Sequence, residues 1–445
     1  MKKDIAILLP YKEKFNINKA GAASIWVKDY LLSSKLNFRT TVYGNLEKKD
    51  KPLLKNFKNI NLDNVFIKKN ISYTEKFYNE CLNNNFKIIE IHNRPESLVY
   101  LIKKKVKGKL IFIFHNNPKE MRSSKSIKDR LFIAENTDQI YFVSNWVKNK
   151  FFEGLPYNYR NNCETLYPAI KPLKKFPKKE KIIIFSGKLN SSKGFDLFGN
   201  AVLKILDKFP NWKAIAIGNE PREKLIFTHK NLKKLGFLKH EKVLDIFTKT
   251  SIAVACSRWN EPLGRTGLEA SSRGCAVIIS NRGGLPETIT NGIIIKRLNE
   301  LNVYNSIKKL IENSKYRRIL QKLSIKNFMH THKNIVNKID LYRNIAIDSD
   351  LLKINYYKKK EKLKILHVTN FNERHDGRLF FNTGRRLNNG FIRLGHSVLE
   401  FSDRDIVKHY KSIKDYTGSK TLNQKLINTV YNYKPDLLIF GHADL

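Results

Sequence analysis

Short apolar runs alternate with longer amphipathic stretches along most of this chain, and this alternation is what most constrains its fold. The pattern is typical of repeated βα units, in which a parallel sheet carries helices on its faces. In the first third we expect strands at residues 4–10, 39–44, 87–92, 110–115 and 139–144. Helices are expected between them, for example at 21–35 and 96–107.

A second βα series follows a basic, proline-marked segment at 168–181, which predicts an interdomain linker. Its expected strands lie at 181–187, 212–218, 232–237, 252–257 and 276–281. A helical pattern at 303–345 closes this series. Two α/β halves in tandem predict a cleft between them, with ligands at the carboxyl ends of the strands.

A third series begins after a charged linker at 357–364. Strands are expected at 363–369, 397–402 and 435–442, with a helix at 379–395. This is the opening half of another nucleotide-type fold. Because the sequence stops directly after a strand, we expect a truncated domain or a tail that pairs elsewhere.

Composition narrows the class of protein. The longest apolar runs, such as 110–114 and 252–256, are far too short to span a bilayer. The first residues, MKKDIAILLPYKEK, predict a strand and not a signal peptide, so we expect a cytoplasmic protein. The four cysteines stand singly, which suggests neither a disulfide framework nor a zinc site.

The net charge is extreme. The chain has 84 Lys and Arg against 40 Asp and Glu, a formal charge of +44. Such a field attracts polyanions, so a nucleic-acid or polyanion-binding protein is the alternative function. However, Lys, Asn and Ile are all frequent along the whole length of the chain, and AT-rich coding alone would produce this composition. Both explanations of the charge stay open, and with no recognised nucleic-acid motif we expect no nucleic-acid partner.

The segment 257–287 holds the richest group of polar residues. Pro262 restricts Glu261 to extended backbone, so Glu261 belongs to a loop just before a helix at 265–274. The positive N-terminus of that helix is a natural phosphate site. Glu269 follows eight residues after Glu261, so two carboxylates flank that site, spaced to hold hydroxyls on either side. Taken alone, Glu261 and Glu269 are explained more simply as part of a helix with an acidic first turn than as a binding site.

With its surroundings, this segment resembles the signature of glycosyltransferase family 4, retaining enzymes of the GT-B fold. Residues 261–270 match its pattern E-P-x-G-x-x-x-x-E-A, and 283-GGLPE-287 matches the segment that follows. The resemblance covers about residues 1–345. It implies that Glu261 contacts hydroxyls of the transferred sugar and that Glu269 grips the nucleotide ribose. Backbone amides around three neighbouring residues would face the sugar and diphosphate, namely Leu263, Gly264 and Arg265.

A second match, 186-SGKLNSSKGFD-196, resembles the family segment in which two cations clamp the donor diphosphate. Lys193 stands at the position of one of these two cations. The other position is Lys188, where the family usually has Arg, so the charge is kept but the bidentate fork is lost. The resemblance implies no metal and no other cofactor, because lysines and amides replace a metal. The D-x-D pairs at 348–350 and 403–405 are therefore set aside.

The first half carries weaker matches. Gly21, in 18-NKAGAASIWVKDY-30, would let backbone amides approach the donor or acceptor. His115 corresponds to a family histidine near the transferred sugar. The acceptor side would be shaped by His92, Asn93 and Arg94. Either histidine could instead be a hydrogen-bonded structural residue.

The resemblance therefore predicts an α/β chain with two Rossmann-like GT-B domains facing across a cleft, plus a partial third α/β domain. The expected parts are 1–170 for the acceptor, 171–325 for the nucleotide-sugar, helices at 326–350, a linker at 351–361 and the partial domain at 362–445. The implied function is transfer of a sugar, with retained configuration, from a nucleotide-diphosphate sugar to a glycan or lipid-linked acceptor in cell-surface polysaccharide or lipopolysaccharide synthesis. The cations at 103–109 suggest either peripheral contact with the inner face of an anionic membrane or, as the plainer interpretation, a solvated helix end.

Overall fold

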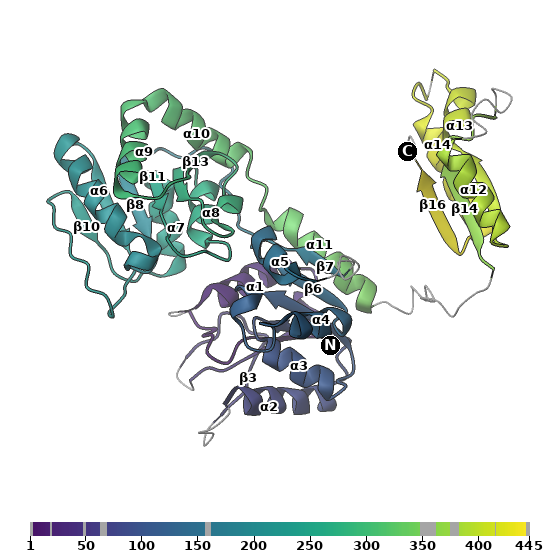
Figure 1. The fold of residues 1–445 in the computed structure, drawn as a ribbon, viewed down its shortest axis with the longest axis horizontal. Helices are drawn as coiled ribbons and strands as arrows, with labels where there is room; N and C mark the ends of the chain where they lie inside the picture. The colour runs from purple at the N-terminus through teal and green to yellow at the C-terminus, as the bar shows by residue number, and fades with distance from the viewer. Residues whose placement is uncertain are drawn as a thin grey trace. The chain divides into compact units, whose positions relative to one another are not determined.

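The computed structural model describes residues 3–17, 20–47, 50–62, 69–155, 162–347, 362–373, 382–413 and 415–441. The chain divides into two compact units, residues 1–349 and 350–445, which are treated separately (Figure 1). The predicted linker at 351–361 and the first D-x-D pair lie outside the described residues. Within the described part, no helix combines the length and apolar character needed to cross a membrane.

The first unit opens with an N-terminal domain built on a parallel seven-stranded sheet, whose strand order is β3-β2-β1-β4-β5-β6-β7. The strands are β1 (Ile5–Leu8), β2 (Thr40–Gly44), β3 (Phe57–Asn59), β4 (Ile88–His92), β5 (Lys109–Phe114), β6 (Gln139–Phe142) and β7 (Cys163–Thr165). The helices are α1 (Ala22–Ser33), α2 (Lys69–Asn83), α3 (Pro95–Lys103), α4 (Ile127–Glu135) and α5 (Asn145–Phe152).

The central strands are buried throughout, which is why they appear in the sequence as continuous apolar runs. The strand order reverses between β1 and β4, the switch point at which parallel sheets open a crevice. The edge strands β3 and β7 were not predicted. They have three residues each and are largely half-buried or exposed, so they carry no apolar run.

The C-terminal domain repeats this arrangement with a parallel sheet ordered β10-β9-β8-β11-β12-β13. The strands are β8 (Glu180–Ser186), β9 (Lys213–Ile217), β10 (Leu232–Lys234), β11 (Thr250–Ala255), β12 (Ala276–Ser280) and β13 (Gly292–Ile295). The helices are α6 (Phe195–Lys208), α7 (His240–Lys249), α8 (Arg265–Ser272), α9 (Glu300–Glu312) and α10 (Ser314–Lys326). Apolar clusters fill both faces of this sheet, one under α6 and α9 and one under α7 and α8. The edge strand β13 was not predicted.

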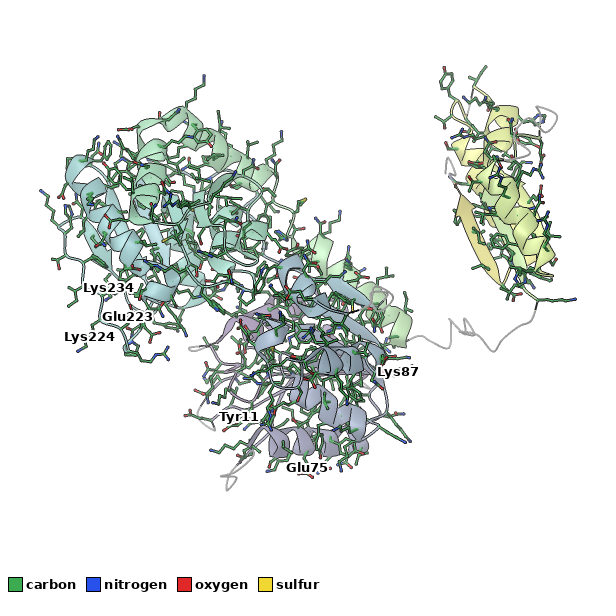
Figure 2. The ribbon with its side chains drawn as sticks, in the orientation of Figure 1. Tyr11, Glu75, Lys87, Glu223, Lys224 and Lys234 are labelled. Atoms are coloured by element: carbon green, nitrogen blue, oxygen red, sulfur yellow. The ribbon has the colours of Figure 1, made fainter. Side chains whose placement is uncertain are left out.

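The last helix of the first unit, α11 (His332–Ile347), returns to the N-terminal domain (Figure 1). Val336, Ile339 and Ile347 belong to the apolar core of that domain. Lys87 Nζ donates to the carbonyl of Ile347 over 2.6 Å and so holds the end of the helix (Figure 2). The chain therefore crosses between the two domains twice.

The second unit is a small α/β layer with parallel strand order β15-β14-β16. Its elements are β14 (Lys364–Thr369), α12 (Thr383–Arg393), β15 (Ser397–Ser402), α13 (Asp403–Tyr410), α14 (Ser419–Tyr433) and β16 (Leu437–Gly441). Leu366, Val368, Phe401, Leu422 and Leu426 form its core. The D-x-D pair at 403–405 opens α13, where Asp405 accepts a hydrogen bond from the amide of Glu373 at 2.9 Å.

The carboxylate of Glu287 joins the two domains of the first unit. It accepts from the amides of Asn145 at 2.7 Å and Trp146 at 2.8 Å, and from the hydroxyl of Tyr167 at 2.7 Å. Glu287 therefore caps the N-terminus of α5 from the other domain, where a negative charge is favoured. Beside it, Ser144 Oγ donates to the carbonyl of Pro262 at 2.5 Å.

We predict that Glu287→Ala lowers the free energy of unfolding of the first unit by about 1–3 kcal/mol, since three donors lose their acceptor. Thermal unfolding followed by calorimetry measures this. The matched control is Glu300→Ala, at the start of α9, whose exposed ion pair with Lys204 should contribute less than about 1 kcal/mol. Equal melting points for Glu287→Ala and the parent would contradict the assigned role.

Candidate active site

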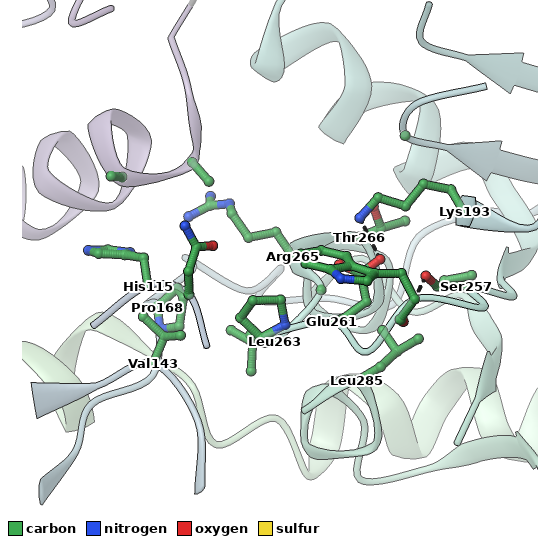
Figure 3. Close-up of a pocket in the computed structure, with 18 of the residues that line it drawn as sticks. His115, Val143, Pro168, Lys193, Ser257, Glu261, Leu263, Arg265, Thr266 and Leu285 are labelled. Atoms are coloured by element: carbon green, nitrogen blue, oxygen red, sulfur yellow. Dashed lines mark hydrogen bonds and ion pairs between the residues drawn. The ribbon is translucent and has the colours of Figure 1, made fainter. Parts of the chain in front are cut away.

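A cavity of about 410 Å3 lies between the two domains, at the carboxyl ends of the central strands of both sheets (Figure 3). The N-terminal domain contributes side chains from the loops after β1, β4, β5 and β6. The C-terminal domain contributes the loops after β8 and β11 and the start of α8. The polar and aromatic lining residues include Glu13, Trp26, Asn93, His115, Asn116, Ser186, Lys193, Ser257, Trp259, Glu261, Arg265 and Thr266.

The loop carrying Glu261 is fixed by backbone pairing with the Gly-Gly segment that follows β12. Glu261 and Gly283 form an isolated parallel bridge, and the amide of Gly284 donates to the carbonyl of Glu261 at 2.7 Å. A Cβ on Gly283 would lie 2.1 Å from that carbonyl oxygen, and Gly283 has a φ of +61°. Glycine is therefore required here, because backbone lies where a side chain would be. The two matching sequence segments, 261–270 and 283–287, form one structural feature.

Helix α8 begins immediately beside this loop. Gly264 is its N-cap, with a φ of +91° that favours glycine, and a Cβ there would lie 2.4 Å from Leu285 Cδ1. Leu263, Gly264 and Arg265 all line the cavity. The free amides and the positive end of the helix dipole therefore meet the cavity, an arrangement suited to an anion.

Lys193 is paired with Glu261 in the wall of the cavity. Its Nζ lies 2.6 Å from Glu261 Oε1 and 4.6 Å from the centre of the Trp259 ring (Figure 3). The side chain of Asn190 accepts from the amide of Lys193 at 3.0 Å and fixes the short 3-10 turn at 191–193 that carries this lysine. Arg258 links that turn to the Glu261 loop, because it donates to the carbonyl of Ser191 at 2.6 Å.

Glu269 lies one turn into α8, behind the cavity wall. Its Oε1 is 2.9 Å from His240 Nε2 and 3.1 Å from Arg265 Nε. Arg265 also reaches Asp29 of α1 in the other domain, at 3.4 Å. Burial alone would raise the pKa of Glu269, but the hydrogen bond from His240 and the charge of Arg265 together outweigh it and lower that pKa. Glu269 is therefore ionised at neutral pH.

His115 lies on the N-terminal side of the cavity (Figure 3). Its amide donates to Asn93 Oδ1 at 3.2 Å, and its Nε2 lies 2.9 Å from Nδ1 of His92. Burial lowers the pKa of His115 well below its ordinary value, with smaller contributions from His92 and Arg265, so the ring is neutral at pH 7.

A second cavity of about 490 Å3 shares Asn116 and Trp259 with the first. Its wall includes Tyr11, Arg94 and Arg122 (Tyr11 is labelled in Figure 2). Arg122 Nε lies 3.0 Å from Glu96 Oε1, which is also in this wall. Aromatic faces beside charged and amide groups suit a polar ligand with apolar edges, such as a sugar.

The structure brings most of the predicted site residues together at the first cavity. His115, Asn93, Lys193, Glu261, Leu263, Gly264 and Arg265 line it. Arg94 lines the second cavity, and His92 is fully buried behind His115. The remaining predicted residues, Gly21, Lys188 and Glu269, line neither of these cavities.

Lys188 and Gly21 each have an identifiable neighbour. Lys188 is exposed, and its charge assists Arg222 in lowering the pKa of Glu220 to about 2. Gly21 is the N-cap of α1, and residues 18 and 19 of its loop lie outside the described residues. The carboxylate of Glu13 occupies the space beside Gly21 and accepts from the amide of Ser24 at 2.9 Å.

Sequence reasoning missed Glu13, Trp259, Asn116 and His240. Trp259 and Asn116 stand two residues before Glu261 and directly after His115, so proximity to the motifs could have suggested them. Glu13 and His240 stand alone in segments without a motif. Among the described residues, no three His, Cys, Asp or Glu side chains are grouped as metal ligands.

Comparison with known proteins identifies relatives of this chain. Residues 167–326 match the family model described as Glycosyl transferases group 1. Spore coat protein SA of Bacillus subtilis (strain 168) is 25% identical over 288 residues, covering 57% of this chain and 76% of that protein. The lipopolysaccharide core biosynthesis mannosyltransferase LpsB of Rhizobium meliloti (strain 1021) is 30% identical over 123 residues, covering 25% of this chain and 35% of that protein.

Solved structures resemble the first unit. Anabaena Alr3699/HepE in complex with UDP-glucose has a TM-score of 0.63 at 14% identity, covering 76% of this chain and 99% of that one. Sucrose-phosphate synthase (tll1590) from Thermosynechococcus elongatus has a TM-score of 0.61 at 16% identity, covering 78% of this chain and 100% of that chain. Together with the two Rossmann-like sheets, these likenesses confirm the predicted GT-B fold class.

The lowered pKa of Glu269 predicts a pH-dependent contribution to stability. That contribution is complete above the unfolded-state pKa of about 4.3 and is lost as the pH falls through the lower folded-state pKa. Glu269→Gln should therefore lower the melting point most at pH 6–7, and the difference from the parent should shrink below about pH 4. Calorimetry between pH 3 and 7 measures it, with Glu312→Gln, an exposed glutamate on α9, as the control. A difference that stays constant with pH would contradict this assignment.

Proposed function

We propose that this chain, a glycosyltransferase whose residues 167–326 match the Glycosyl transferases group 1 model, transfers a sugar from a nucleotide-diphosphate sugar to a glycan or lipid-linked acceptor. The observation that carries this proposal is the meeting of Lys193, Glu261 and the N-terminus of α8 in one interdomain cavity. The UDP-glucose complex of Alr3699/HepE and the mannosyltransferase LpsB support such a donor. A role in cell-surface polysaccharide or lipopolysaccharide synthesis is part of the proposal.

The donor occupies the first cavity in this proposal. Its diphosphate takes the place beside Lys193 and the amides of Gly264 and Arg265, where both a cation and a helix N-terminus favour an anion. The sugar hydroxyls are held by Glu261 and by His115. The ribose lies toward Glu269, which Arg265 and His240 keep ionised and oriented.

Transfer proceeds with retention, as the family 4 resemblance implies. The bond from the anomeric carbon to the diphosphate oxygen breaks, and the bond to the acceptor oxygen forms on the same face of the sugar. The acceptor proton passes to the departing diphosphate, so the protein supplies orientation and charge stabilisation. Lys193 stabilises the charge that develops on the diphosphate and takes the place of a metal ion.

The acceptor approaches through the second cavity, which adjoins the first at Asn116 and Trp259. Tyr11 offers an aromatic face for a sugar ring, and Arg94 with Lys12 adds positive charge. An acceptor bearing a phosphate or carboxylate fits this wall. Peripheral contact with an anionic membrane through the exposed cations at 103–105 stays a prediction.

We predict that Lys193→Ala lowers kcat by about 100-fold, because the leaving diphosphate loses its neutralising charge. Release of nucleoside diphosphate from the accepted nucleotide-sugar measures the rate. Lys204→Ala is the matched control, since Lys204 is an exposed lysine of α6 that lies outside the cavity lining and is paired with Glu300. A Lys193→Ala rate within about threefold of the parent would refute the proposal that Lys193 stabilises the leaving diphosphate.

A further inference from the structure

Four side chains are hydrogen-bonded in series from the cavity wall to helix α11. His115 Nε2 lies 2.9 Å from His92 Nδ1, and His92 Nε2 lies 2.8 Å from Glu90 Oε1. Glu90 Oε2 accepts from Nη2 of Arg343, which α11 supplies. The last bond of the series therefore joins two residues that are 253 positions apart in the sequence.

The series is shielded from solvent. His92, Glu90 and Arg343 each have an exposed fraction of 0%. Trp26 packs edge-on against both histidine rings, with ring centres 5.3 Å and 5.9 Å away. The Arg343 guanidinium lies 4.4 Å above the ring of Tyr30. Buried polar groups this far from water have the geometry of their hydrogen bonds set by their partners.

While Glu90 is ionised, the chemistry of Arg343 and of the carboxylate fixes the direction of every bond in the series. An arginine has donors only, so Glu90 must accept from it. When Glu90 is ionised, its other oxygen also accepts, and His92 Nε2 must carry the proton. Burial lowers the pKa of His92 to about 3, so its ring is neutral and its Nδ1 is an acceptor. His115 Nε2 must then donate to it, which leaves Nδ1 of His115 as an acceptor.

We propose that ionised Glu90 and Arg343 are positioning residues that act through His92 to hold His115 in the Nε2-protonated form, so that Nδ1 accepts a hydrogen bond from a hydroxyl of the transferred sugar. This deepens the proposed function, on which its catalytic part rests. Helix α11 thereby contributes to the site without touching it: its docking supplies the guanidinium that sets the tautomer of a cavity residue some distance away.

The substitution Glu90→Gln inverts the series while preserving its shape. The oxygen of the new amide must face Arg343, because that arginine only donates, so the NH2 of the amide faces His92 Nε2. His92 then carries its proton on Nδ1 and donates to His115 Nε2. The proton of His115 moves to Nδ1, where the parent presents an acceptor.

Two-dimensional long-range 1H–15N NMR of protein labelled with 15N-histidine reads these tautomers directly. Spectra are recorded at about pH 8.5, above the pKa of Glu90, which burial and the charge of Asp340 raise to about 8, and below that of Arg343, which burial lowers to about 9. His92→Gln and His115→Gln assign the two rings. We expect both rings protonated on Nε2 in the parent and on Nδ1 in Glu90→Gln.

The control is Tyr30→Phe, which removes the 2.8 Å hydrogen bond to Asp340 beside the series but no bond within it. It should keep the parent tautomers while removing one contact that docks α11. A parent with His115 protonated on Nδ1, or a folded Glu90→Gln protein with unchanged tautomers, overturns the proposal.

Activity separates this proposal from the proposed function. At about pH 8.5, where Glu90 is ionised, Glu90→Gln should lower kcat/KM for the accepted nucleotide-sugar about 10- to 100-fold, the loss expected when a ligand hydroxyl meets a buried donor in place of an acceptor. The tautomers are read without any donor, so they test the series even if no nucleotide-sugar binds. Inverted tautomers with an unchanged kcat/KM would overturn the catalytic part of the proposal and leave the proposed transfer intact.

Discussion

The backbone contact between Glu261 and Gly283–Gly284 determines where the chemistry of this chain is located. It closes two loops of the C-terminal sheet against each other and sets the start of α8 at the cavity. Three residues further on, Glu287 caps α5 of the other domain, so the same segment fixes both the site and the neighbouring domain. The position of the cavity thus depends on Gly283 and Gly284, which leave room for the backbone of Glu261 and Pro262. It also depends on the carboxylate of Glu287, which accepts hydrogen bonds from amides at the N-terminus of α5 that have no partner within the helix.

Ion pairs occupy the cavity walls. Lys193 is paired with Glu261, and Arg265 is shared between Glu269 and Asp29 of the opposite domain. A diphosphate would compete with Glu261 for Lys193 and release that carboxylate for sugar hydroxyls. The Arg265–Asp29 contact spans the two domains, so a ligand that engages Arg265 would also act on the closure of the cleft. The charged groups are therefore held in the cavity wall before the donor arrives, and the Lys193–Glu261 pair opens to receive it.

The periodicity of the sequence was sufficient to predict the central strands and the doubly wound class, because strands buried on both faces are continuous apolar runs. The edge strands β3, β7 and β13 escaped prediction because their burial is partial and their length short. Of the site, the residues in the two loop motifs were predicted from the resemblance of their segments to glycosyltransferase family 4. Glu13, His240, Glu90 and Arg343 were not, since each acts through a partner that only the tertiary fold brings near. Whether Lys188 joins Lys193 on the donor stays a prediction.

The central claim is that the interdomain cavity binds a nucleotide-sugar, and a thermal-shift series tests it most directly. The parent is heated with UDP, GDP, ADP and their common sugars, with heparin and duplex DNA as polyanion comparisons. A ligand at about one hundred times its dissociation constant stabilises by about 2.7 kcal/mol, which a melting curve resolves. The account predicts a raised melting point with one nucleotide and a smaller rise for Lys193→Ala. Stabilisation by heparin or DNA with no response to any nucleotide would contradict it and favour a polyanion-binding protein.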